Sequence, residues 1–204
     1  MIRILFLSVL IFSFTGCKDF LNLAPVSSAN VQNFYKTATD FDNALVGAYS
    51  TLAARGVFDD DIQLVGDLRS DNTEMGTTAS DRSYYFQLSE FSDEVTNPIV
   101  SSIWNNHYDG INDVNKILDH IGNLDASDPA QARIAGESKF LRGLFYFNLV
   151  RVFGDVPLIT SSLTSIADAY SKGRTETTEV YKQIIADLSD AEAGLPDVAS
   201  QSGR

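Results

Sequence analysis

The sequence has few of the residues from which disulfides and metal sites are built. It contains one cysteine, Cys17, and two histidines, His107 and His120, in 204 residues. A single cysteine excludes an intramolecular disulfide, and the two histidines lack the spacing of transition-metal ligands. The acidic run DDD at 59–61 could contribute to a calcium site, but it has neither the spacing nor the turn glycine of an EF-hand. We therefore expect no metal site and no cofactor.

Basic residues and long apolar runs are also scarce. The chain has 15 Lys and Arg against 27 Asp and Glu, a net charge of −12. Nucleic acid is thus an unsuitable partner, because phosphate binding needs a clustered basic face. The longest apolar run, Ile4 to Phe14, is interrupted only by Ser8 and Ser13. As a helix it would span about 16 Å, against about 30 Å for the hydrocarbon core of a membrane.

Motifs of the common enzyme classes are missing. The sequence has no G-x-S-x-G elbow, no phosphate-binding loop and no dinucleotide fingerprint. Neighbouring carboxylates such as Asp93 and Glu94 could in principle hydrolyse a glycoside, but such an acid and base need a separation that only a folded cleft sets. We expect a protein that is not an enzyme, and keep a glycosidase as a third alternative.

The N-terminus has the layout of an export signal. Arg3 precedes the apolar run, which ends in Phe14-Thr15-Gly16-Cys17. Small residues before a cysteine are what a bacterial lipobox requires, although Phe14 departs from the usual aliphatic residue. We predict a signal peptide over 1–16, lipid attached to Cys17, and a tether over 17–28, which contains Pro25. The alternatives are an ordinary secretory cleavage site or a free thiol.

Most of the remaining chain has the 3.6-residue period of amphipathic helices. Capping residues, helix-starting prolines and terminal glycines place four helices: Thr39 to Arg55, Asn97 to Gly122, Asp128 to Phe153, and about Thr177 to Leu195. Residues 56–96 have no sustained period and are predicted to form long loops, with room for a short strand or a turn of helix. No sheet is expected. The predicted fold class is all-α, with tetratricopeptide-like helical repeats and long irregular loops.

Several blocks along the chain carry a family resemblance. In order they are Cys17 to Leu21 with Pro25, Ala44 to Tyr49 (ALVGAY), Trp104 to Asn115 (WNNHYDGINDVN), Gly136 to Pro157 (GESKFLRGLFYFNLVRVFGDVP) and Arg174 to Leu188 (RTETTEVYKQIIADL). This order resembles the SusD-like (RagB/SusD) family of bacteroidete surface glycan-binding lipoproteins. Members are more than twice this length, so 29–204 would be the N-terminal helical-repeat domain of such a protein, truncated at its C-terminus.

The resemblance and the residues together suggest a binding site. A sugar needs an aromatic face for its apolar side and planar or charged side chains for its hydroxyls. The 66–96 segment offers both, and family members place some ligand contacts there. The candidate ligand-binding residues are Asp71, Asn72, Arg82, Tyr84 and Tyr85. The alternative is an ordered loop whose aromatic side chains fill the helical layer.

The resemblance implies a function on the cell surface. The protein would be a lipid-anchored outer-membrane lipoprotein, facing the exterior, that binds oligosaccharide and delivers it to a TonB-dependent (SusC-like) transporter. The alternative is a helical-repeat lipoprotein that mediates only protein–protein interaction. Trp104, Asn115, Arg142 and Asn148 are expected to be scaffold residues, because each lies in a block that any helical-repeat protein would need.

Overall fold

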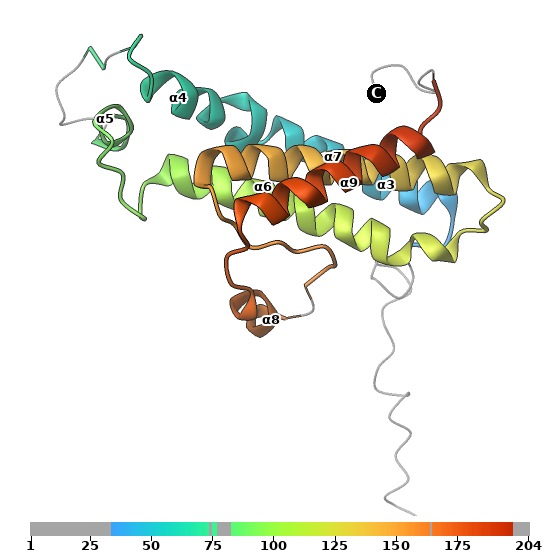
Figure 1. The fold of residues 1–204 in the computed structure, drawn as a ribbon. Coiled ribbons are helices and arrows are strands. Elements are labelled where there is room, and N and C mark those ends of the chain that lie inside the picture. The colour runs from blue at the N-terminus through green and yellow to red at the C-terminus, as the bar shows by residue number, and fades with distance from the viewer. Residues whose placement is uncertain (1–33, 74, 77–82, 164, 198–204) are drawn as a thin grey trace, which may run out of the picture. The chain divides into compact units, whose positions relative to one another are not determined.

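The computed structural model describes residues 34–73, 75–76, 83–163 and 165–197. They fall almost entirely in one compact unit, Tyr35–Arg204, which Figure 1 shows as layered helices. The predicted signal peptide, Cys17 and the tether lie outside the described residues. No helix in the described ranges is both long and apolar enough to cross a membrane.

Short helices make up the first part of this unit. They are α3 (Ala38–Ser50), a 3-10 turn (Thr51–Ala53), a π-helical turn (Arg55–Asp59), α4 (Asp61–Leu68) and α5 (Ser83–Ser89). α3 begins with a capping box in which the Thr37 side chain accepts from the Asp40 N–H and the Asp40 carboxylate accepts from the Thr37 N–H, at 3.2 and 2.9 Å. The predicted cap at Thr39 is wrong by two residues.

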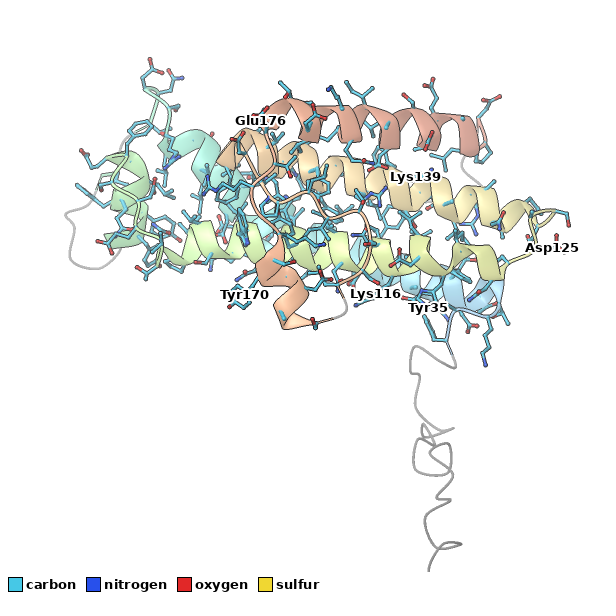
Figure 2. The ribbon with its side chains drawn as sticks, turned by 60° about the horizontal axis from the view of Figure 1, so that its bottom comes forward. Tyr35, Lys116, Asp125, Lys139, Tyr170 and Glu176 are labelled. Atoms are coloured by element: carbon cyan, nitrogen blue, oxygen red, sulfur yellow. The ribbon has the colours of Figure 1, made fainter. Side chains whose placement is uncertain are left out.

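The second part is built from long helices. They are α6 (Pro98–His120), α7 (Pro129–Phe153), the short α8 (Ile166–Ser171) and α9 (Thr177–Gly194). Asn97 and Asp128 cap α6 and α7 as predicted, and Gly154 ends α7 with a φ of 70°. In Figure 1, α7 runs antiparallel to α6 and to α9 and also contacts α3. Figure 2 shows Lys139 of α7 on the side of α9, where it forms an ion pair with Asp190 at 2.6 Å.

The core lies where α3, α6, α7 and α9 meet. Its fully buried side chains include Phe41, Leu45, Ile103, Ile111, Ile117, Leu141, Phe145, Tyr146 and Leu149. Within the described residues there is no strand; the only pairing of that kind is an isolated bridge between Val156 and Thr175. The fold is all-α, with tetratricopeptide-like antiparallel helices and long irregular segments, as predicted.

A buried polar network holds the segment after α7 against the helices. The Arg142 guanidinium donates to both carboxylate oxygens of Asp187 at 2.7 and 2.8 Å, and also to the Asn115 side chain at 2.8 Å and to the Thr160 carbonyl at 3.0 Å. Asn115 in turn donates to the Ile159 carbonyl at 3.0 Å. The expected scaffold role of Asn115 and Arg142, satisfied by a neighbouring loop, matches these contacts.

The apolar positions of α7 and α9 are not all buried. Phe140 of α7 is 41% exposed, and Ile185 of α9 is 63% exposed, although both belong to the apolar pattern of their helices. The buried stripe of α9 instead includes Asp187, which the ion pair with Arg142 makes tolerable. Residues 56–96 also contain more helix than predicted, because α4 and α5 both lie there.

Candidate functional site

Tyr84 and Tyr85 lie on α5, at one end of the described helical layers (Figure 1). Both are half-buried, and their rings are 4.5 Å apart between centroids at an angle of 41°. They pack against a buried cluster that consists of Leu68, Leu88, Ile99 and Ile103. These two aromatic residues therefore fill the helical layer and still retain exposed surface.

Asn97 fixes the position of α5 against α6. Its side-chain NH2 donates to the Tyr84 carbonyl at 2.9 Å and to the Gln87 side chain at 2.8 Å. Its side-chain oxygen accepts from the Ile99 N–H at 3.0 Å and so caps α6. Because Asn97 is 2% exposed, water competes little for these bonds, and the bond to the Tyr84 carbonyl ties α5 to the start of α6.

A pocket of about 300 Å³, which we call the Tyr84 pocket, opens beside this tyrosine. It is lined by Arg55, Asp61, Tyr84, Pro98, Ile99 and Ser102. The volume is at the lower end of the usual range of small-molecule sites, roughly 300 to 1,000 Å³. The lining combines an aromatic face, a hydroxyl and both signs of charge.

Arg55 is the centre of the polar side of the Tyr84 pocket. Its Nε donates to Asp61 Oδ1 at 2.9 Å, and its Nη2 lies 3.1 Å from Asp60 Oδ2 and 3.4 Å from the Tyr85 hydroxyl. The hydrogen bond and charge of Asp61 raise the pKa of Arg55, so the guanidinium stays charged. Asp61 is 1% exposed, and Arg55 is the cation that pairs with its buried carboxylate.

This arrangement is suited to binding and positioning. An aromatic face can contact the apolar side of a pyranose, while Arg55 donates to its hydroxyl oxygens. The carboxylates weighed for hydrolysis are elsewhere: Asp93 forms an ion pair with Arg69, and Glu94 is exposed.

The structure brings together only some of the candidate residues. Tyr84 lines the pocket, and Tyr85 contacts Arg55 at its edge. Asp71 and Asn72 are exposed in the turn after α4 and do not line this pocket. Arg82 lies outside the described residues.

Sequence reasoning missed Arg55, Asp61 and Ser102. Arg55 was taken as the end of a helix, and Asp61 was weighed only as a calcium ligand. The available signal was the proximity of Arg55 to an acidic run in a region without helical period. No local signal pointed to Ser102, because this residue reaches the pocket only when α6 packs beside the π-helical turn.

The fold and this pocket together define the class as an all-α helical-repeat protein with a pocket that is lined by an aromatic ring and by charged residues. Residues 19–202 match a SusD-like family described as "Starch-binding associating with outer membrane". The chain belongs to this SusD-like family.

Individual relatives agree with this assignment. SusD-like protein P25 of Formosa agariphila is 31% identical over 96% of this chain and 38% of its own length; SusD-like protein P2 of the same organism is 29% identical over 93% and 37%. A structure described as a laminarin-binding SusD-like protein is 30% identical, with a TM-score of 0.72 over 83% of this chain and 37% of that one. A SusD homologue from Bacteroides thetaiotaomicron is 25% identical, with a TM-score of 0.72 over 89% and 35%. The chain thus spans less than two fifths of the length of these relatives.

Proposed function

We propose that this chain is the N-terminal, glycan-contacting part of a non-enzymatic outer-membrane lipoprotein, anchored through Cys17 and facing the exterior. It would bind an oligosaccharide and deliver it to a TonB-dependent, SusC-like transporter. The observation that carries the proposal is the Tyr84 pocket, where an aromatic face adjoins the Arg55–Asp61 pair. Membership of a family described as starch-binding and the similarity to a laminarin-binding protein support a neutral glucan as ligand.

The roles of the pocket residues follow from their chemistry. The Tyr84 ring would cover the apolar face of one sugar, and the Arg55 guanidinium and Ser102 hydroxyl would bind its hydroxyl groups. Asp61 would act indirectly by keeping Arg55 in place through the 2.9 Å contact. Asp71, Asn72, Arg82 and Tyr85 stay candidate ligand contacts, with Asp71 and Asn72 on the turn after α4 and Tyr85 on α5.

The test is isothermal titration of the chain with laminarin- and starch-derived oligosaccharides. We expect Tyr84→Ala to weaken binding by about fivefold or more, because burial of an aromatic face contributes at least about 1 kcal/mol. Tyr170→Ala is the matched control, since Tyr170 is 86% exposed on α8, which Figure 2 shows at another part of the unit. A reducing-sugar assay should detect no product. Failure of every glycan to bind, or equal affinity of the Tyr84 variant, would overturn the proposal.

The anchor and the transporter need separate tests. Cys17→Ala should abolish incorporation of labelled palmitate and release the protein from membranes; unchanged labelling would contradict lipidation. The transporter partner should co-purify with the tagged wild-type protein from native membranes. Its absence, with glycan binding intact, would remove the delivery step and leave a binding protein.

A further inference from the structure

A second pocket lies between α4 and the C-terminal part of α7. It has a volume of about 260 Å³ and shares no lining residue with the Tyr84 pocket. Its apolar lining consists of Ile62 and Val65 of α4 and Val152 of α7, and its polar lining of Arg69, Asn148 and Arg151. We call it the arginine pocket. This volume is just below the usual range of small-molecule sites, roughly 300 to 1,000 Å³, so the pocket suits a small group.

One buried donor at the arginine pocket has no partner among the described residues. Asn148, which was expected to be a scaffold residue, is 5% exposed, yet its side-chain nitrogen makes no hydrogen bond with any described group. Arg69 is paired with Asp93, although Arg69 Nε and Asp93 Oδ1 each lack a hydrogen bond. A buried donor without an acceptor costs about 1–3 kcal/mol, so such groups call for an explanation. A ligand that brings acceptor oxygens would satisfy them.

The charge at the arginine pocket is positive, although the whole chain has a net charge of −12. Two arginine residues line it, and no acidic residue does so among the residues that the structure describes. Arg69 forms an ion pair with Asp93, whereas the Arg151 guanidinium lies over the Phe147 ring at 5.0 Å and has no ion pair within the described ranges. The planar arginine fork matches the paired oxygens of a carboxylate or sulfate.

We propose that the arginine pocket binds the acidic unit of a glycan, a sugar ring that bears a carboxylate or a sulfate ester. Arg151 and Arg69 bind the anionic group, Asn148 donates to one of its oxygens, and Ile62, Val65 and Val152 contact the apolar face of the ring. This inference rests on the proposed glycan binding and adds a second subsite. The second subsite would prefer an acidic sugar unit, whereas the Tyr84 pocket would bind a neutral one.

The test compares three probes on the same chain by isothermal titration or by NMR shift perturbation: methyl glucuronide, methyl glucoside and sodium sulfate. We expect methyl glucuronide to bind, and we expect high salt to weaken its binding because salt screens the attraction between charges. Methyl glucoside should bind at least tenfold more weakly than methyl glucuronide. Arg151→Gln should weaken glucuronide binding at least tenfold and should fold normally, because Arg151 is exposed. Arg174→Gln removes the same charge from another exposed position and should leave the affinity unchanged.

The other outcomes separate this proposal from the first. Equal affinity of the Arg151 and Arg174 variants, or equal binding of the glucuronide and the glucoside, would overturn the acidic subsite. Sulfate ion that binds as tightly as methyl glucuronide would reduce the pocket to a simple anion site, which also contradicts the proposal. Tyr84→Ala should not alter glucuronide affinity; if neutral oligosaccharides bind through Tyr84 and glucuronide does not bind, only the second proposal fails.

Discussion

Gly56 shows how strongly one residue without a side chain can determine local packing. It is buried in the π-helical turn, and its N–H donates to the side chain of Asn106 at 3.0 Å. A Cβ added there would lie 2.3 Å from the carbonyl oxygen of Ser102, which belongs to the backbone of α6 and cannot rotate away. The close approach places Arg55 beside the Tyr84 pocket, so this glycine positions the polar side of the candidate site.

Gly56→Ala should therefore destabilise the protein by about 1–3 kcal/mol, the usual range for overpacking. The control is Gly47→Ala, because Gly47 is exposed within α3 and nothing lies within 4 Å of an added Cβ. That change should stabilise by roughly 0.5–1 kcal/mol through the lower backbone entropy of alanine in the unfolded chain. Urea denaturation measures both, and equal effects of the two substitutions would contradict the packing argument.

His107 predicts a pH dependence of stability. It is fully buried, with Nδ1 2.7 Å from the Ile103 carbonyl and no partner for Nε2 among the described groups. Burial lowers its pKa below the ordinary 6.5, so the folded protein keeps it neutral. Below about pH 6.5 the unfolded chain takes up a proton that the folded chain does not, and stability falls by up to about 1.4 kcal/mol per pH unit until the folded pKa is reached.

His107→Gln isolates this contribution, because glutamine fills a similar volume and does not titrate. The difference in unfolding free energy between wild type and variant should be constant above pH 7 and shrink as the pH falls below 6.5. Thermal or urea unfolding at pH 5 to 8 measures it. A difference that stays constant over the whole range would show that His107 titrates alike in both states.

At the scale of elements, the Arg142–Asp187 pair joins α7 to α9 and holds the segment that follows α7. Asp187→Ala would leave a guanidinium buried without its carboxylate, which typically costs about 3–5 kcal/mol. Replacing both partners by apolar residues, Arg142→Met with Asp187→Leu, should recover much of that loss. Urea denaturation of the wild type and the two variants measures these effects. A double variant no more stable than Asp187→Ala would mean that the bonds of Arg142 to Asn115 and Thr160 dominate.

The elements differ in how far their sequences predict them. α6 and α7 have strong signals at their starts, Asn97-Pro98 and Asp128-Pro129, and many helical periods, so their bounds are predicted almost to the residue. α4 and α5 have only eight and seven residues, too few for a clear period. Their helices depend on packing against Ile99 and Ile103, which are distant in sequence.

Only part of the candidate site was predictable, because some of its residues meet only when segments distant in sequence pack together. Tyr84 was found because an aromatic residue in an irregular segment is a local signal. The Arg55–Asp61 contact and Ser102 depend on the packing of the π-helical turn against α6, and local sequence does not encode it. The arginine pocket joins Arg69 to Arg151 across 82 positions of sequence and left no recognisable local pattern.

At the scale of the whole molecule, the outer side of α7 and α9 exposes apolar surface. Phe140 and Phe147 of α7 are 41% and 39% exposed, and Ile185 of α9 is 63% exposed. The ring centroids of Phe147 and Tyr181 of α9 are 6.5 Å apart, so the two helices contribute to one surface. We therefore infer that this surface can contact another apolar surface.

The chain alone should therefore self-associate through this surface as its concentration rises. Ile185→Gln with Phe140→Gln removes apolar area without altering the net charge and should shift sedimentation-velocity profiles toward the monomer. Val46→Gln is the control, since Val46 is 54% exposed on α3 and offers a similar loss of apolar area elsewhere. If the control has the same effect, association does not depend on this surface. If only the double variant is monomeric, the exposed face of α7 and α9 is the contact. The double variant can then be tested for loss of binding to the proposed transporter.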